Sequence, residues 1–460
     1  MLKRKIEEKL NFWFENRKQA LLITGARQIG KTKSITEFIK TKFESIIHID
    51  FSDRTDLIDS FALLNSADDL LLRLSVVAGD KLVAHKTVIF FDEIQLVYKR
   101  RDELKKNGML PTISQDLLTA MKSLVNKGDY RFILSGSLLG VTIKDVILNP
   151  TGYLDEYKMY PMDFEEFLWA KGVGQNAIDH VKHCFETKMP VDISVHTFFL
   201  NAFREYVLVG GMPEAVEALV EKKNLFLVQE ALDQINKRYQ QDITTYVDDD
   251  GLKMRIRDVY KAIPSQLSKK NMRFVSSQVL NKQYLKHNKI EDEFLWLVAA
   301  GVAIPTYHVD EPVIPLSLSV ERKTMKLFSS DVGILVSQLV DTGIREKLLN
   351  NEMVVNYGAP YENVVAQELI AHGFDEELFY YNSKLHGEVD FLITINNEIL
   401  PIEIKSGKPS ESITYDHAAL TNLINTHKYP SAYVFGSTNV IKENDIIYQL
   451  PIYMIDFVRK

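Results

Sequence analysis

The chain has 460 residues, which is enough for about three domains. Hydrophobic residues make up 46% and charged residues 25% of it, which excludes a disordered tail, a collagen and a small disulfide scaffold. The net charge of -7 shows no overall basic excess, although a local basic patch can be hidden within this average. Cys184 is the only cysteine, so an intrachain disulfide is excluded and a reducing compartment is expected.

The N-terminal residues 1–18 lack the apolar core and the small-residue cleavage site of a signal peptide. The most apolar runs, such as residues 295–304, are far shorter than the ~20 residues that a membrane helix needs. The sequence therefore predicts a soluble cytoplasmic protein with no membrane partner. The 11 histidines are scattered, and no metal-ligand spacing is evident among them.

Apolar runs alternate with helical patterns from the N-terminus to about residue 165. Strands are predicted at residues 20–23, 45–51, 87–91 and 130–134, and a helix over residues 31–43. Strands separated by helices indicate a parallel sheet with covering helices, so the fold class predicted for this segment is α/β.

The rest of the chain shows three further patterns. Residues 166–250 read almost entirely as helix, and a run of aspartates before Gly251 suggests a boundary. A compact helical segment follows, then a strand at residues 302–308, and a second α/β pattern runs from about residue 345 to the end. The predicted domains are therefore residues 1–165, 166–250, 251–345 and 346–460.

The first predicted strand ends in a phosphate-binding loop. Residues 25–32 match G-x-x-x-x-G-K-[ST] at every fixed position, between a strand and a helix. Backbone N–H groups and the helix N-terminus would face the phosphates, Lys31 would reach the β- and γ-phosphates, and Thr32 would bind Mg²⁺. The cofactors predicted here are ATP and Mg²⁺, and the predicted nucleotide-binding residues are Gly25, Ala26, Arg27, Gln28, Ile29, Gly30, Lys31, Thr32 and Lys33.

A second apolar strand ends in two acids that would complete the site. Asp92 is predicted to hold Mg²⁺, and Glu93 to polarise the attacking water. The adjacent Asp-Glu pair resembles the ATPase branch that includes the AAA-type and signal-transduction NTPases. In that branch the polar end of the next strand senses the γ-phosphate, which implicates Ser137, with Ser135 behind it.

Four later segments resemble one family more specifically. Residues 159–167 are similar to its Pro-Leu-Ser-Phe-x-Glu-Phe segment, residues 210–215 to its Gly-Gly-x-Pro-Glu segment, and residues 331–335 to its Asp-x-Gly-Leu-Leu segment. Residues 361–363 also fit. Together they resemble the bacterial and archaeal AAA-type ATPases that carry a C-terminal domain of unknown function. The resemblance implies an AAA-type ATPase domain at 1–165, a helical lid or linker at 166–250, and a winged-helix-like domain at 251–345.

One departure from the family concerns an arginine. The family usually has Gly-Arg shortly before the Pro-Leu-Ser-Phe segment, and here that place is Gly152-Tyr153. An arginine that stabilises transition-state charge must then come from elsewhere in the chain or from a second copy in a homo-oligomer. The candidates within the chain are Arg27, Arg100, Arg101 and Arg131.

A basic stretch lies in the middle of the chain. Residues 265–290 carry six lysine or arginine residues and no acid, flanked by apolar residues at helical spacing. This pattern resembles a winged helix whose lysines contact DNA phosphates, with a recognition helix beginning near Glu291. Three acids at residues 291–293 open that helix and disfavour groove entry, so a solvated basic face is the alternative interpretation.

The C-terminal region combines charged and apolar residues in two alternating strands. Asn396-Asn397 is predicted to close a hairpin in which paired residue numbers sum to 793. Asp390 would then lie opposite Glu403, and Glu388 opposite Lys405, on one face. Two opposed carboxylates repel, so a cation or a shared proton is expected between them.

This set has the D…E-x-K pattern of restriction-endonuclease-like domains. The resemblance implies that Asp390 and Glu403 bind a second Mg²⁺ or Mn²⁺, that Lys405 activates the water, and that Glu362 is the additional helix glutamate. Such a fold can also bind DNA without cleaving it. The predicted function is Mg²⁺-dependent ATP hydrolysis coupled to DNA binding and to nucleic-acid cleavage; the alternative is a nucleotide-controlled switch or scaffold whose C-terminal domain binds a partner.

Overall fold

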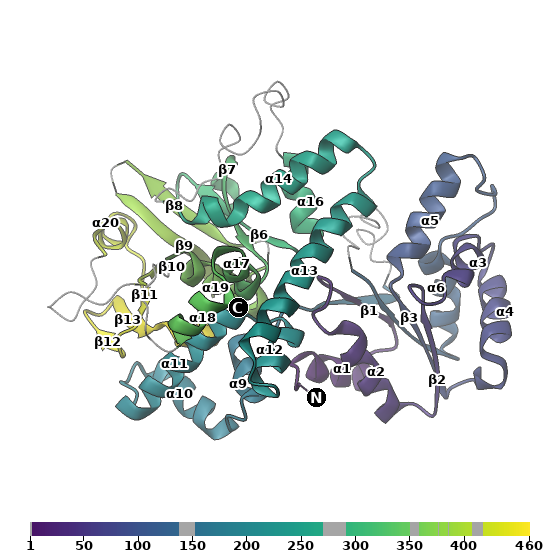
Figure 1. Ribbon diagram of the computed structural model, residues 1–460, viewed down its shortest axis with the longest axis horizontal. Helices are drawn as coiled ribbons and strands as arrows, with labels where there is room; N and C mark the ends of the chain where they lie inside the picture. The colour runs from purple at the N-terminus through teal and green to yellow at the C-terminus, as the bar shows by residue number, and fades with distance from the viewer. Residues whose placement is uncertain are drawn as a thin grey trace. The chain divides into compact units, whose positions relative to one another are not determined.

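The computed structural model describes residues 2–137, 152–269, 291–349, 358–375, 377–384, 386–406 and 417–460. The chain forms two compact units, and Figure 1 shows their secondary structure. One unit contains residues 3–160 with 299–301, and the other contains residues 161–298 and 302–460 with the first two residues. Within the described ranges, no helix has both the length and the apolarity required to cross a bilayer.

The N-terminal unit is built on a five-stranded parallel sheet with the order β2-β3-β4-β1-β5. The predicted α/β class is confirmed here, and the four predicted strands lie within two residues of their expected limits. The strands are β1 (Ala20–Thr24), β2 (Ser45–Asp50), β3 (Thr87–Asp92), β4 (Arg131–Ser135) and β5 (Leu154–Lys158).

Helices surround this sheet because both of its faces are apolar. The face that carries Leu22, Ile49, Phe91 and Leu134 packs with Phe61, Leu74, Met121 and other side chains of the following helices into one core. The α-helices are α1 (Ile6–Asn16), α2 (Lys31–Lys42), α3 (Ile58–Ala62), α4 (Ala67–Ala78), α5 (Gln95–Lys106) and α6 (Leu117–Lys127), with short 3-10 turns at Thr55–Leu57 and Gly79–Lys81.

The second unit begins with helices, as the sequence predicts for residues 166–250. They are α9 (Phe164–Ala170), α10 (Gln175–Thr187), α11 (Ile193–Val209), α12 (Pro213–Val220), α13 (Leu225–Tyr246) and α14 (Asp250–Leu267). Side-chain caps begin several of them, such as Asp163 for α9 and Asp192 for α11. After residues 270–290, α16 (Glu291–Ala299) leads to the mixed sheet.

The mixed sheet has eight strands in the order β12-β13-β11-β10-β9-β8-β6-β7. Because β6 and β7 pair with each other and β6 pairs with β8, the predicted boundary at residue 345 separates strands of a single sheet. The strands are β6 (Ala303–Val309), β7 (Val320–Ser329), β8 (Phe379–Ser383), β9 (Gly387–Ile395), β10 (Glu398–Ile404), β11 (Ala432–Gly436), β12 (Ile441–Lys442) and β13 (Ile447–Pro451).

Helices accompany this sheet on both faces. Leu420, Leu423 and Ile424 of α20 (Ala418–His427) pack on the face that carries Val389 and Val434. In Figure 1, α19 lies in front of β9 and β10, and its contacts include β7 and β10. The remaining elements are the 3-10 turns η3 (Leu316–Ser319) and η5 (Ile452–Phe457), the π-turn η4 (Ile370–Phe374), and the helices α17 (Val332–Leu339), α18 (Thr342–Leu349) and α19 (Gly358–Leu369).

The predicted hairpin register is confirmed over five residue pairs. These pairs run from Glu398 opposite Ile395 to Ile402 opposite Phe391. Asn396 and Asn397 form the turn with φ angles of 51° and 63°, values that asparagine tolerates better than most residues.

Beyond these pairs β9 bulges. Phe379 on β8 pairs with Leu392 on β9, and the next pair is Tyr381 with Val389. Between these pairs β8 advances by two residues and β9 by three, so β9 contains one extra residue. The described pairs of β9 with β10 end at Phe391 and Ile402, so the predicted pairings of Asp390 with Glu403 and of Glu388 with Lys405 lie beyond them. Glu388 contacts Lys326 of β7 at 2.7 Å, and Lys405 contacts Glu403 at 2.5 Å.

Candidate functional site

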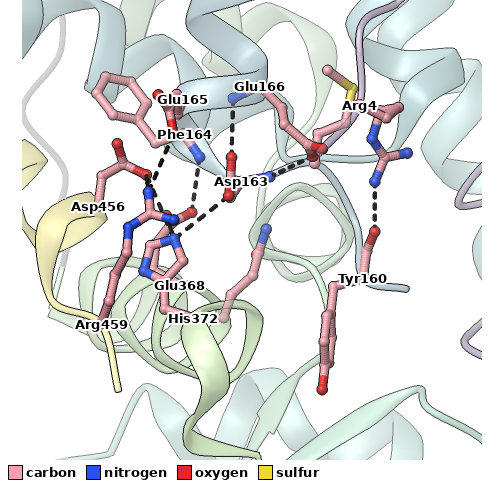
Figure 2. A network of polar contacts seen from close by, with 12 residues as sticks. Arg4, Tyr160, Asp163, Phe164, Glu165, Glu166, Glu368, His372, Asp456 and Arg459 are labelled. Carbon is pink, nitrogen blue, oxygen red and sulfur yellow. Dashed lines mark hydrogen bonds and ion pairs between the residues drawn. The ribbon is translucent and has the colours of Figure 1, made fainter. Parts of the chain in front are cut away.

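The loop between β1 and α2 has the conformation that a phosphate-binding loop needs. Gly25 and Gly30 adopt φ angles of 137° and 93°, and a Cβ on Gly25 would lie 2.2 Å from the carbonyl oxygen of Met159. Arg4 joins the loop to the segment after β5, because its guanidinium donates to the carbonyl oxygens of Ile29 at 2.6 Å and Tyr160 at 2.8 Å. Figure 2 shows Arg4 and Tyr160.

Lys31 and Thr32 occupy the start of α2, where the sequence places them. The Lys31 ammonium donates to the loop carbonyls of Gly25 at 3.0 Å and Ala26 at 2.7 Å. Burial lowers the pKa of Lys31 to about 8, although Glu93 and Asp92 oppose this shift. Lys33, the last residue of the predicted nucleotide-binding set, is exposed.

Asp92 lies beside Thr32, and these are the two predicted Mg²⁺ ligands of the ATPase site. The Thr32 hydroxyl donates to Asp92 Oδ2 at 2.6 Å, and the Ser135 hydroxyl donates to Asp92 Oδ1. Burial by itself would raise the pKa of Asp92, but hydrogen bonds from His48, Ser135 and Thr32 outweigh it and hold the pKa below its ordinary value. A hydroxyl beside an ionised carboxylate is a donor set that suits Mg²⁺.

Glu93 and Ser137 meet because β4 lies between β1 and β3. Parallel strands present their carboxyl ends at one edge, which places the end of β4 next to both the loop and the acidic pair. Ser137 Oγ donates to Glu93 Oε2 at 3.0 Å. Glu93 itself has a φ of 55°, an unusual backbone conformation for this residue type.

Two residues that the sequence did not single out complete this group. The Gln95 amide donates to Ser137 Oγ at 3.2 Å and also contacts Glu93. His48 stacks on Phe90 with ring centroids 4.5 Å apart, and its Nε2 lies 3.8 Å from Asp92 Oδ2. Neither residue belongs to a motif, since each reaches the site from its place on a neighbouring element.

The four candidate arginines differ in their contacts. Arg27 Nε donates to Ser137 Oγ at 3.1 Å, at the predicted γ-phosphate end of the site. Arg100 pairs with Asp59 and Glu103, Arg101 donates to the carbonyl oxygens of Ala62 and Ser114, and Arg131 stacks on Trp13. Within the N-terminal unit, Arg27 is therefore the candidate that contacts a predicted site residue.

A second cluster, which we call the carboxylate–lysine cluster, lies on the mixed sheet. It contains all four residues of the predicted nuclease-like set, together with two that were not in it. Its members are Lys326 on β7, Glu362 on α19, Glu388 and Asp390 on β9, Glu403 on β10, and Lys405 directly after β10.

Lys326 is the residue that sequence reasoning missed. Its side chain is fully buried, and its Nζ lies 3.3 Å from Glu362 Oε2 and 2.7 Å from Glu388 Oε1. Burial would lower the pKa of Lys326, but Glu362, Glu388 and Asp390 outweigh it and raise the pKa. No strand is predicted at residues 320–329, and the signal that could have found Lys326 is a charged residue within the apolar run of Met325, Leu327 and Phe328.

The carboxylates of this cluster hold their protons more tightly than isolated ones. Burial, aided by Asp390, raises the pKa of Glu403 to about 7, and burial raises the pKa of Glu362 to about 8. The pKa of Asp390 is raised as well, mainly by burial, while its Oδ2 accepts the Ile404 N–H at 2.7 Å. Such shifts are expected where carboxylates are buried close to one another.

Glu403 offers a free ligand atom. Its Oε1 is paired with Lys405, but its buried Oε2 has no hydrogen-bond partner among the described residues. A buried oxygen of this kind is costly unless an ion or a proton satisfies it. The residues present therefore fit a divalent cation.

The predicted winged-helix surface falls largely outside the described residues. Lys270, Arg273, Lys282, Lys286 and Lys289 all lie in the gap at residues 270–290. The candidate recognition helix is present as α16, and the strand after it, β6, belongs to the eight-stranded sheet.

Three models of known families match successive parts of the chain. Residues 17–168 match the model of a family described as an AAA domain, which supports an AAA-type P-loop ATPase domain in this part of the chain. Residues 200–351 and 357–455 match two further models, each described as a domain of unknown function (DUF8612 and DUF4143). No curated protein matches the chain.

Several solved structures match at low identity. A Walker-type ATPase of Pyrococcus abyssi is 14% identical, with 74% of this chain and 96% of that chain covered and a TM-score of 0.40. A RuvB mutant of Thermotoga maritima is 15% identical, with 57% and 76% covered and a TM-score of 0.24. PCH-2 of C. elegans is 15% identical, with 51% and 64% covered and a TM-score of 0.26.

Proposed function

We propose that the chain is a Mg²⁺-dependent ATP hydrolase whose nucleotide cycle acts on a nuclease-like, nucleic-acid-binding domain. The observation that carries the ATPase part is the meeting of Thr32, Asp92, Glu93 and Ser137 at the carboxyl edge of one parallel sheet. At these positions Thr32 and Asp92 would bind Mg²⁺, Glu93 would act as the base and Ser137 would contact the γ-phosphate.

In this mechanism Glu93 accepts a proton from the water that attacks the γ-phosphorus. The bond between that phosphorus and the β–γ bridging oxygen breaks, and ADP and phosphate leave. Lys31 turns from the loop carbonyls to the phosphates, where negative charge restores its proton affinity. Thr32 and Asp92 would hold Mg²⁺, which would supply neutralisation of phosphate charge, and Arg27 offers a further positive charge from the Ser137 side.

Removal of the Lys31 ammonium tests the ATPase site. Lys31→Ala should abolish Mg²⁺-dependent ATP hydrolysis, measured as phosphate release by the purified full-length chain. The matched control is Lys40→Ala on the same helix, an exposed lysine paired with Glu37. Hydrolysis by Lys31→Ala at the wild-type rate would show that the site has been assigned wrongly.

The carboxylate–lysine cluster supports phosphodiester hydrolysis as a second activity. Asp390 and the free Oε2 of Glu403 would hold Mg²⁺ or Mn²⁺, which supplies Lewis-acid activation when bound. Lys405, 2.5 Å from Glu403 Oε1, would orient the water, and Glu362 would accept its proton or bind a second cation. The alternative is a nucleotide-controlled switch or scaffold, in which this cluster is structural.

Cleavage of labelled DNA and RNA with Mg²⁺ or Mn²⁺ distinguishes these two functions. Asp390→Asn and Glu403→Gln should each eliminate cleavage, whereas Glu398→Gln, an exposed acid on the same hairpin, should retain it. Absence of metal-dependent cleavage by the wild type across several substrates would favour the switch. Salt-dependent DNA binding without cleavage would retain only the DNA-binding part of the proposal.

A further inference from the structure

A buried histidine lies among carboxylates in the second unit, outside both sites described above. His372 stands in the π-turn η4 at the end of α19, Asp163 begins α9, and Asp456 lies in η5 near the C-terminus. One ligand atom from each of these three residues lies within 4.8 Å of the others, and all three are buried. Figure 2 shows that their side chains converge.

The distances around His372 differ from those of an ordinary ion pair. His372 Nε2 lies 3.5 Å from Asp163 Oδ2, 3.5 Å from Asp456 Oδ1 and 3.6 Å from Glu368 Oε2. A charge-assisted hydrogen bond is about 2.7–2.9 Å long, and one ring nitrogen can donate one proton. Ligand atoms around a tetrahedral Zn²⁺ with bonds of about 2.0–2.2 Å are separated by roughly 3.3–3.6 Å, which agrees with all three separations.

Hydrogen bonds to the other oxygen orient two of these carboxylates. Asp163 Oδ1 accepts the Glu166 N–H at 2.9 Å in a capping box, which turns Oδ2 toward His372. Glu368 Oε1 accepts the Phe164 N–H at 3.1 Å and the Tyr206 hydroxyl at 2.7 Å, which leaves Oε2 facing the ring. Partners of this kind position the ligands in metal sites.

The local charge also favours a divalent cation. Asp163, Glu368 and Asp456 all face the ring, and the Arg459 guanidinium lies 3.8 Å from Asp456 Oδ1. A divalent ion on a neutral imidazole adds two positive charges among these carboxylates, whereas protonation of His372 adds one. Buried carboxylates are costly unless they are compensated, so the ion satisfies them better.

We propose that Asp163, His372 and Asp456 bind one Zn²⁺ ion, with Glu368 facing the fourth coordination position. Imidazole with carboxylate ligands suits Zn²⁺ among the common divalent ions. The ion joins three segments of the same unit that are far apart in the sequence: the start of α9, the end of α19 and the C-terminal turn. Its role is structural, because the ligands are buried and close the site.

The test is a Zn²⁺ titration of the chelator-treated full-length chain in excess Mg²⁺, which occupies the oxygen-ligand sites. The wild type should retain one equivalent of Zn²⁺ after gel filtration, measured by mass spectrometry, and its melting temperature should rise. His372→Gln and Asp456→Asn should lose both effects. His308→Gln should keep both, since His308 faces the exposed acids Asp310 and Glu321 in a comparable group.

Wild-type protein without bound Zn²⁺, or His372→Gln with the wild-type amount, would overturn the proposal. If the variants fail to fold, the Co²⁺-loaded wild type provides the second measurement. A four-coordinate histidine–carboxylate site should give strong visible absorption that one equivalent of Zn²⁺ displaces. A spectrum identical to that of hydrated Co²⁺ would exclude the site. Glu403→Gln should bind as much Zn²⁺ as the wild type. This result would show that the Zn²⁺ site is distinct from the carboxylate–lysine cluster, to which Glu403 belongs.

Discussion

At the scale of single residues, the ATPase site depends on side chains whose positions the motifs predict and on others that they do not. Lys31, Thr32, Asp92 and Glu93 stand at the ends of adjacent elements, as the phosphate-loop pattern requires. Arg27, one of the four arginines that the sequence offers for stabilising transition-state charge, contacts Ser137. This contact makes Arg27 the candidate source of the positive charge that the family places before the Pro-Leu-Ser-Phe segment.

Arg27→Ala should lower the rate constant for ATP hydrolysis about 10²-fold, as the loss of one transition-state charge partner does elsewhere. The affinity for ATP should fall much less, because the loop amides and Lys31 remain. The control is Arg100→Ala, which removes exposed ion pairs to Asp59 and Glu103 that contribute little to stability. Steady-state kinetics and nucleotide titration separate the two effects. Equal rates for Arg27→Ala and Arg100→Ala would point to an arginine from a second copy.

At the scale of elements, the segments that carry the family resemblance meet in one buried polar network. Asp331 Oδ2 accepts the Gly211 N–H at 2.6 Å, and its Oδ1 accepts the Ile334 N–H at 3.0 Å. Asn363 exchanges hydrogen bonds with the backbone of Ser329. The Asp331 bonds join the start of α17 to Gly211 after α11, and the Asn363 bonds join α19 to the end of β7, so packing explains the residue types at Gly211, Asp331 and Asn363.

Gly333→Ala tests this packing. A Cβ at this position would lie 2.1 Å from the Val209 carbonyl oxygen, so the free energy of unfolding should fall by about 3 kcal/mol. Gly343→Ala on α18 is the control, since the atom nearest to its added Cβ is Asp341 Oδ1 at 3.5 Å and alanine favours a helix. Denaturant unfolding measures both changes. A Gly333→Ala protein as stable as Gly343→Ala would contradict the described backbone contact.

At the scale of the whole molecule, stability should depend on pH through the carboxylate–lysine cluster. The pKa of Glu403 is about 7 and that of Glu362 about 8, both above the ordinary value of 4.5 because of burial. Between about pH 4.5 and pH 8, the folded state therefore binds more protons than the unfolded state does. Stability from this source is present below about pH 4.5 and is lost as the pH rises through 7 to 8.

Without divalent ions, the melting temperature should fall between pH 5 and pH 8.5, and Mg²⁺ or Mn²⁺ should reduce that fall by binding the ionised carboxylates. Glu403→Gln, which removes one titrating group, should flatten the profile, whereas Glu398→Gln at an exposed position should follow the wild type. Thermal unfolding at several pH values provides the measurement. A wild-type profile that rises across this range would show that these carboxylates are ionised in the folded protein.

Local sequence signals were sufficient for much of the molecule. They specified the parallel α/β class, the strands that end in the phosphate loop and in Asp92, and five pairs of the C-terminal hairpin. These features depend on periodicity, on turn residues and on motifs of adjacent residues, all of which are local. The β9 bulge is not local, since it arises from pairing with β8, and the contact of Glu388 with Lys326 joins two strands that are far apart in the chain.

Several contacts in the candidate sites join residues whose spacing in the sequence does not predict that they meet. Gln95 contacts Ser137 and His48 contacts Asp92 from neighbouring elements, Lys326 contacts Glu362 and Glu388 on other elements, and Asp163 meets His372 and Asp456 within the second unit. The proposed Zn²⁺ ligands Asp163, His372 and Asp456 follow one another at intervals of 209 and 84 residues, and such spacing leaves no pattern in the sequence. Composition and motifs thus determined the class of the N-terminal domain and predicted its ATPase site, whereas long-range packing determined which charged groups share a buried space.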